Sequence, residues 1–175
     1  MSRNVQVVIL CEDRQHEAFA RRFLDRMGIG ARLLRVSKSP QGRGSAEQFV
    51  GEQFAKELEY YRARSHRVEQ ALVVKVDADR FDVAERVSRV EGHSTRRDGE
   101  RVAIFVPARN IETWLSYLDG QSVDETNSYP RLRRESDCRK HVDVLIGMCQ
   151  RQQLRQPAPP SLEAACKEYL ARLMP

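Results

Sequence analysis

The chain has no long apolar run: none of its 175 residues lies in a stretch approaching the roughly 20 apolar residues of a membrane-spanning helix. No secretory signal precedes the first apolar segment, which begins at Val5, so we expect a cytoplasmic protein that binds no membrane. The four cysteines form no Cys-x-x-Cys pair. Their spacing argues against a zinc ribbon or finger and favours reduced thiols.

Motifs of several enzyme classes are also missing. The chain has no Gly-x₄-Gly-Lys-Ser/Thr phosphate loop, so any dependence on ATP would have to come from a partner protein. No Gly-x-Ser-x-Gly turn presents a serine nucleophile. The first predicted strand is not followed by the Gly-rich turn that a dinucleotide-binding fold requires, which argues against that fold as well.

Charged residues are abundant, at 31% of the chain, and 30 Lys and Arg residues outnumber 25 Asp and Glu residues. The resulting net charge of +5 favours a polyanionic partner such as nucleic acid. The length suits one domain with a single core, and no internal repeat indicates a second. We therefore expect one domain over residues 1–175, with its core at 5–118 and a helical extension at 119–175.

Apolar strands and amphipathic helices alternate through most of the chain. The predicted strands lie at 5–10, 31–36, 71–76 and 101–106. The predicted helices lie at 15–27, in the segment that follows Ser45, and at 83–90, 111–118, 137–152 and 161–173. Ser45 and Asp82 are predicted N-caps, and Gln48 would complete a capping box with Ser45. The order predicts an α/β fold, with a mostly parallel sheet of four strands flanked by helices and a helical C-terminal cap.

Carboxylates follow three of the four predicted strands. Asp77 and Asp79 come after the apolar run at 71–76, and period-two alternation predicts that their side chains point the same way. Glu12 follows the first strand and Glu112 the fourth. Sites in parallel sheets form beyond the carboxyl ends of the strands, where these acids would repel one another without a cation. Their oxygens suit Mg²⁺ or Mn²⁺.

These motifs resemble the Toprim superfamily (topoisomerase–primase domains), and more closely its small stand-alone members related to OLD-family nucleases. The resemblance rests on Glu12, the Asp-x-Asp pair and the Ile-Glu-x-Trp-Leu segment around Glu112, and it covers about residues 5–118. It implies a Rossmann-like fold in which Glu12, Asp77 and Asp79 hold Mg²⁺ or Mn²⁺ for phosphodiester chemistry. It also implies that Glu112 is a further acidic site residue, serving as a ligand or a water-positioning base.

The chain departs from the Toprim pattern beside its first glutamate. Asp13 stands where the family usually has glycine, and His16 stands where a second acid is common, followed by Glu17. His16 could join the site as a proton shuttle, and Glu17 could join it through a water. An ordinary solvated helix surface is the alternative for both residues. The number of bound metal ions, one or two, is therefore left open.

Basic side chains near the predicted site are candidates for contact with phosphate. Arg109 could stabilise a phosphate or orient Glu112, and a structural ion pair is the alternative. The predicted nucleic-acid contacts are Lys38 and Arg43 in a Gly/Pro/Ser loop, and Arg131, Arg133, Arg134 and Lys140 in a basic stretch. A solvated loop and a solvated helix face are the alternatives. No aromatic residues interleave with these cations, so we expect sequence-independent contacts to the nucleic-acid backbone.

The function expected from these features is a Mg²⁺- or Mn²⁺-dependent nuclease for DNA or RNA, acting as an effector in anti-phage defence. One alternative is a non-catalytic or partner-regulated subunit that binds nucleic acid beside a separate ATPase; a homodimer is a further possibility. Another is a phosphatase of the haloacid dehalogenase type, which also uses Asp-x-Asp after a strand. Its motif continues with Thr or Val where this chain has Phe81, so it fits less well.

Overall fold

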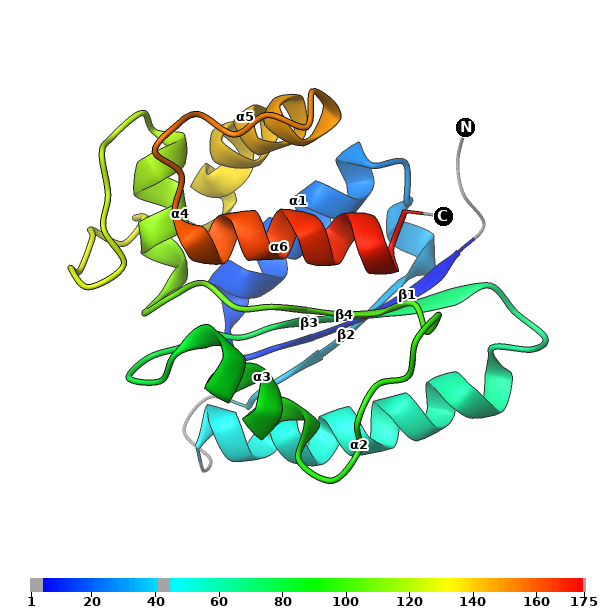
Figure 1. The fold of residues 1–175 in the computed structure, drawn as a ribbon. Helices are drawn as coiled ribbons and strands as arrows, with labels where there is room; N and C mark the ends of the chain where they lie inside the picture. Colours follow the sequence, from blue (N-terminus) through cyan, green and yellow to red (C-terminus); the bar gives the residue numbers. More distant parts are fainter. Residues whose placement is uncertain (1–4, 41–44, 175) are drawn as a thin grey trace.

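The computed structural model describes residues 5–40 and 45–174, which form a four-stranded sheet with helices on both faces (Figure 1). The strands are β1 (Gln6–Cys11), β2 (Leu34–Lys38), β3 (Gln70–Lys75) and β4 (Val102–Phe105). They lie in the order β2-β1-β3-β4, and every neighbouring pair is parallel. The predicted α/β fold class is confirmed, and the sheet is Rossmann-like.

The strands end nearly level with one another. Cys11 of β1 pairs with both Lys38 of β2 and Lys75 of β3, and Lys75 pairs with Phe105 of β4. The residues that follow the strands therefore emerge at one edge of the sheet. The chain winds outward from β1 to β2 and from β3 to β4, so β1 and β3 meet at the topological switch point, where α/β sheets usually bind ligands.

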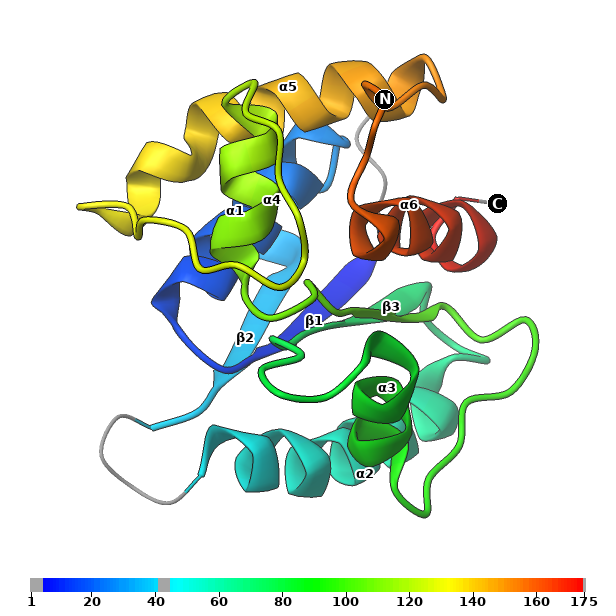
Figure 2. The same cartoon turned by 60° about the vertical axis from the view of Figure 1, so that its left-hand side comes forward.

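Helices cover the two faces of the sheet in separate layers (Figures 1 and 2). One face carries α2 (Ala46–Arg64) and α3 (Val83–Glu91). The other layer contains α1 (Arg14–Arg26), α4 (Ile111–Leu118), α5 (Arg139–Gln150) and α6 (Pro160–Arg172). The predicted C-terminal cap is thus helical, and α6 is part of the layer that lies on the sheet.

Alternating side chains of β3 supply both cores. Leu72 and Val74 pack among residues such as Phe54 of α2. Val73 belongs instead to the cluster containing Leu24 of α1 and Tyr169 of α6. Because both faces of β3 are covered, its sequence is a continuous apolar run, which is the pattern that marked it as a buried strand.

The second predicted strand begins later than expected. Residues Ala31–Leu33 form a 3-10 helix, η1, in which the Leu33 N–H donates to the Gly30 carbonyl at 3.0 Å. Because of this turn, β2 begins at Leu34, and it continues to Lys38, into the segment predicted as a loop. The helix predicted at 137–152 likewise opens with a 3-10 turn, η2 (Glu135–Cys138), before α5.

Two predicted helix caps are confirmed. The Ser45 hydroxyl accepts from the Gln48 N–H at 3.1 Å, and the Asp82 carboxylate accepts from the Glu85 N–H at 2.7 Å. The reciprocal half of the predicted capping box is not formed, because the Gln48 amide donates to Glu52 one turn later. Each cap satisfies a backbone donor that the first helical turn leaves unpaired.

Replacing the cap of α3 should have a measurable cost. We expect Asp82→Ala to lower the free energy of unfolding by about 1 kcal/mol, because the Glu85 N–H loses its acceptor. Asp98→Ala is the matched control, since Asp98 is exposed in the turn before β4. Urea unfolding of both variants measures the difference, and equal stabilities would show that the Asp82 cap contributes nothing.

Helix α6 also covers the outer edge of β4. The Glu168 carboxylate accepts from the Ile104 N–H at 3.1 Å and forms an ion pair with Arg96. This bond satisfies a main-chain donor that an edge strand would otherwise leave open. Within residues 5–40 and 45–174, no helix combines the length and apolar character needed to cross a membrane.

Candidate metal centre

Glu12 and Asp77 meet just beyond the ends of β1 and β3. One Glu12 carboxylate oxygen, Oε2, accepts from the Asp77 N–H at 2.9 Å. Because Cys11 and Lys75 are register partners, the residues that follow them leave the sheet side by side. The expected meeting of carboxylates from these two strands is therefore present in the structure.

His16 approaches the same point from α1. Asp13 caps this helix by accepting from the His16 N–H at 2.9 Å, which places the imidazole in the first turn, facing the sheet. The ring is fully buried, with Nδ1 3.0 Å from the Lys75 carbonyl oxygen and Nε2 3.0 Å from an Asp77 carboxylate oxygen. A carbonyl oxygen can only accept, so Nδ1 carries a proton and Nε2 is left to face the carboxylate.

A proton or a metal ion is required between His16 Nε2 and Asp77. If the ring were neutral, the Nε2 lone pair would point at a carboxylate oxygen, which is unfavourable. Burial lowers the pKa of His16, but the charge and hydrogen bond of Asp77 raise it more, to about 9. In the metal-free protein a proton therefore occupies this position, and a metal ion could replace it. Metal-ligating histidines commonly donate their other N–H to a main-chain carbonyl, as His16 does.

Glu12, His16 and Asp77 form a set that could hold a cation. Their ligand atoms all lie within 4.8 Å of one another, in the part of the chain that the structure describes. Two carboxylates and one imidazole are ligands for divalent metals, and the Lys75 carbonyl fixes the imidazole orientation. The donor set and its burial fit the cation that the acidic pattern predicted.

Arg86 of α3 lies behind Glu12. It is 1% exposed, and its guanidinium pairs with the second Glu12 oxygen, donates from Nε to the Asp77 carbonyl at 2.9 Å, and lies 3.2 Å from a Glu47 oxygen. Burial raises the pKa of Glu12. The hydrogen bond from the Asp77 N–H and the charges of His16 and Arg86 lower it, but by less than burial raises it. Arg86 is therefore the internal counter-ion of Glu12.

Asp79 lies outside the three-residue set. β3 ends at Lys75, and the chain beyond it bonds to the segment after β4: the Ala78 N–H donates to the Pro107 carbonyl and the Asp79 N–H to that of Arg109. Asp79 and Arg109 both adopt positive φ, 53° and 61°, which is unusual for residues other than glycine. Such strain concentrates at functional sites. Asp79 is more exposed than Asp77 and does not join it in one ligand group.

Glu112 occupies the first turn of α4 and is 6% exposed. Burial raises its pKa, and the negative charge of Asp77 raises it further. It pairs with Arg131, with 3.6 Å between Arg131 Nε and a Glu112 oxygen. Glu112 therefore feels the field of the candidate centre without being one of its three grouped ligands.

The predicted phosphate-binding cations differ in what they contact. Arg109 donates to the Thr126 carbonyl at 2.6 Å rather than to Glu112. Lys38 pairs with Glu17 at 2.7 Å, so Glu17 is directed to Lys38 and Arg21. Arg131, Arg133, Arg134 and Lys140 are all exposed, with Arg134 near Asp137 and Lys140 bonded to Asp119. Arg43 lies outside the described residues.

Sequence reasoning did not identify Arg86. A signal for it exists in the sequence, because Arg86 shares the apolar stripe of α3 with Val83, Val87 and Val90. A charged residue on the buried face of an amphipathic helix indicates a buried partner, which here is Glu12.

Comparison of the chain with protein-family models, with curated proteins and with solved structures finds no match.

Proposed function

We propose that the protein is a metal-dependent nuclease of the Toprim type, with Glu12, His16 and Asp77 as metal ligands. The observation that carries the proposal is the orientation of His16: its Nδ1 is committed to the Lys75 carbonyl, and its Nε2 faces a carboxylate. This arrangement suits a histidine ligand in which a metal ion replaces the proton on Nε2. The imidazole in the set favours Mn²⁺ over Mg²⁺, which prefers oxygen ligands.

The metal and the residues around it would have different roles in phosphodiester cleavage. A bound metal would neutralise phosphate charge and activate water. Arg86 holds Glu12 and the Asp77 main chain in place through buried contacts. Glu112 and Asp79 lie at the same sheet edge, where they could orient water or share a second ion. Phosphoryl chemistry needs mainly positioning and charge neutralisation, so the lack of a serine or cysteine nucleophile is consistent with the proposal.

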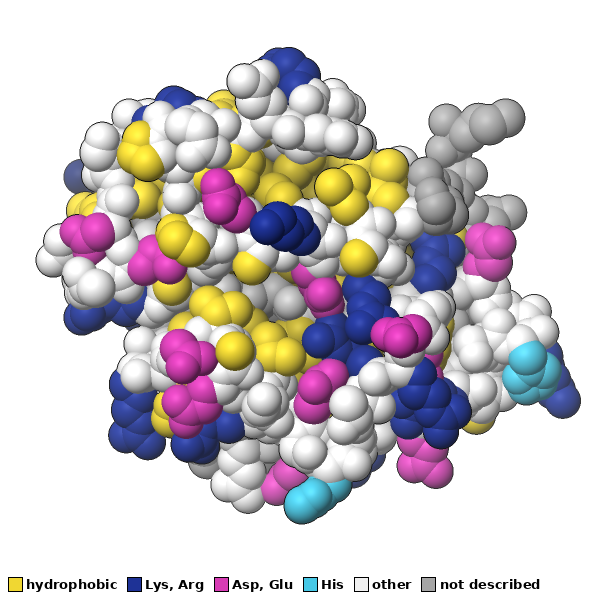
Figure 3. Space-filling model, in the orientation of Figure 1, with side chains coloured by type: hydrophobic (Ala, Val, Ile, Leu, Met, Phe, Trp, Pro, Cys, Tyr) yellow, Lys and Arg dark blue, Asp and Glu magenta, His cyan; other side chains and the backbone are white. Residues whose placement is uncertain are grey.

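Nucleic acid is the proposed substrate. The face of the molecule seen in Figure 3 carries basic and acidic side chains interspersed, with no single basic field. The exposed arginines before α5 are better placed, because Arg131 lies beside Glu112 and hence beside the candidate centre. Contacts from such residues would be made to phosphates and would position either DNA or RNA without reading its sequence.

Removing two of these arginines should weaken the salt dependence of binding. We expect Arg131→Ala/Arg133→Ala to reduce the slope of log K against log salt by about 2 for duplex DNA, because each lost phosphate contact removes about 0.9. Arg64→Ala/Arg67→Ala is the control, since these exposed arginines precede β3 at the opposite end of the sheet. Fluorescence anisotropy across a salt series measures both slopes, and equal slopes would exclude the segment before α5 from the contact.

The direct test of the proposed function is cleavage. End-labelled plasmid, single-stranded DNA and tRNA are incubated with the purified protein in Mn²⁺, Mg²⁺ or EDTA. We expect cleavage of at least one substrate in Mn²⁺ or Mg²⁺ and none in EDTA. Cleavage that persists in EDTA would refute the metal requirement, and the cleaved substrate would identify the nucleic-acid class.

A second candidate function is favoured by a specific observation. Arg86 and His16 already neutralise Glu12 and Asp77, so the acids are not left without cations when metal is absent. The protein could therefore be a nucleic-acid-binding subunit, regulated by a separate ATPase in an anti-phage complex or assembled as a homodimer. This candidate predicts binding without cleavage and no rise in melting temperature with Mn²⁺.

A further inference from the structure

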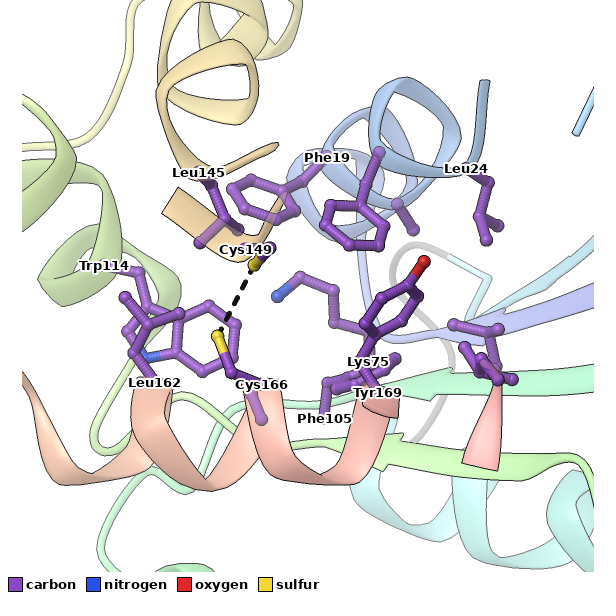
Figure 4. A pocket seen from close by; sticks show the side chains of 15 residues that line it. Phe19, Leu24, Lys75, Phe105, Trp114, Leu145, Cys149, Leu162, Cys166 and Tyr169 are labelled. Atoms are coloured by element: carbon purple, nitrogen blue, oxygen red, sulfur yellow. Dashed lines mark hydrogen bonds between the residues drawn. The ribbon is translucent and has the colours of Figure 1, made fainter. Parts of the chain in front are cut away.

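A buried lysine lies next to the candidate centre but is directed away from it. The Lys75 carbonyl orients His16, whereas its side chain extends into the interior on the α1 and α6 face of the sheet (Figure 4). Lys75 is 2% exposed, and its Nζ has no hydrogen-bond partner in the part of the chain that the structure describes. A charged amine without an acceptor is rare in protein interiors.

Two aromatic rings flank the amine. Lys75 Nζ lies 4.3 Å from the ring centroid of Trp114 and 4.6 Å from that of Phe19. Their faces attract the positive charge, and the Trp114 N–H is already used on the Ser161 hydroxyl at 2.8 Å. Ring faces offset only part of the hydration that the ammonium loses, because they have no lone pair that could accept a hydrogen bond from its N–H groups.

The amine points into a cavity of about 50 Å³. Its wall is built from α1, α4, α5, α6 and the strands β3 and β4, and is almost wholly apolar. A water molecule needs only about 10–15 Å³ of such space, so the cavity has room for one larger atom or a very small molecule. It is too small for a nucleotide or a sugar.

The polar groups of the residues that line the cavity include the Lys75 amine, two thiols and the Tyr169 hydroxyl, which donates to the Met174 sulfur at 3.3 Å. The Cys149 and Cys166 sulfurs lie 3.6 Å apart, so one thiol can donate to the other and leave the second S–H free to donate elsewhere. Together with the Lys75 ammonium, this makes the cavity rich in donors and poor in acceptors. A water molecule would need acceptors for its own protons, whereas an anion needs only donors.

We propose that this cavity is a binding site for a small monovalent anion of halide size, held by Lys75 as its counter-charge. Chloride is the natural occupant by size and charge. Its hydration is weak enough for an apolar site, unlike that of fluoride, and the ion pair would remove the unpartnered charge from the core. The site is separate from Glu12 and Asp77, and it does not depend on the proposed nuclease activity.

Thermal unfolding tests the proposal at pH 7 in EDTA, with ionic strength held constant while sodium fluoride is exchanged for sodium chloride or bromide. We expect the melting temperature of the wild type to rise by about 3–6 °C when the halide exceeds its Kd tenfold. Lys75→Met removes the charge while keeping the side-chain length, and should abolish the rise. Lys167→Met, on the exposed side of α6, is the matched control and should keep it.

A second measurement does not depend on the variant folding. Wild-type crystals grown or soaked in bromide should show an anomalous peak beside Lys75 Nζ. A peak there, together with a halide effect lost in Lys75→Met, supports the proposal. An empty or water-filled cavity in bromide, or equal halide effects in the wild type and Lys75→Met, would overturn it.

Discussion

Asp77→Asn is expected to abolish metal-dependent cleavage and the stabilisation of the protein by Mn²⁺. Asparagine keeps the volume of the side chain but removes the negative charge that faces His16. Asp77 is also one of the three grouped ligands, together with Glu12 and His16. Mutating a residue that merely orients a metal ligand typically costs about 10- to 100-fold in activity or affinity. Loss of a ligand should therefore reduce cleavage by more than about 100-fold.

Stabilisation of the wild type by Mn²⁺ separates the two candidate functions, and Asp77→Asn tests whether Asp77 is a ligand. In the wild type, Mn²⁺ at about 100 times its Kd should raise the free energy of unfolding by about 2.7 kcal/mol. Asp77→Asn should lose this gain, whereas Asp98→Asn, which changes an exposed acid in the turn before β4, should keep it. Calorimetry with and without Mn²⁺ measures the gain. If Asp77→Asn retains both cleavage and the gain, Asp77 is not a ligand.

Arg86→Met is expected to be the most destabilising single change near the centre. It would leave the Glu12 carboxylate buried without its counter-ion and remove the donor to the Asp77 carbonyl. Breaking a buried ion pair by removing one partner costs about 3–5 kcal/mol. The melting temperature should therefore fall by roughly 6–20 °C in EDTA.

Metal should reverse part of that loss. With Arg86 gone, a bound cation becomes the main neutraliser of Glu12, so the rise in melting temperature with Mn²⁺ should be larger in Arg86→Met than in the wild type. Arg89→Met is the matched control, because Arg89 is exposed on the same helix, where it pairs with Glu47 and Glu85 and lies over the Phe81 ring. Arg86→Lys should recover part of the stability. A loss no greater than that of Arg89→Met would contradict the role of Arg86 as internal counter-ion.

Much of the fold follows from local sequence patterns. The continuous apolar run of β3, the caps Ser45 and Asp82, and the bounds of α4 were all predictable, because each depends on residues close together in the chain. The start of β2 was predicted too early because the turn closed at Gly30 depends on backbone geometry rather than on residue type. Periodicity in the sequence carries no signal for such a turn.

The candidate centre was predictable only in part. Period-two alternation suggested that Asp77 and Asp79 act together, but it applies within a strand, and β3 ends at Lys75. The positive φ of Asp79 then takes its side chain out of the alternation. The burial of Arg86 and His16 depends on partners 74 and 61 residues away, so it could be found only once the fold was known.

The position of α6 has a consequence for folding during synthesis. All four strands and the residues of the candidate centre leave the ribosome before α6, which supplies Tyr169 to the core and Glu168 to the edge of β4. A nascent chain therefore passes through a stage in which the sheet is complete but its last strand is uncovered. At that stage the β4 edge could pair with another nascent chain. The emergence of α6 ends this vulnerable interval.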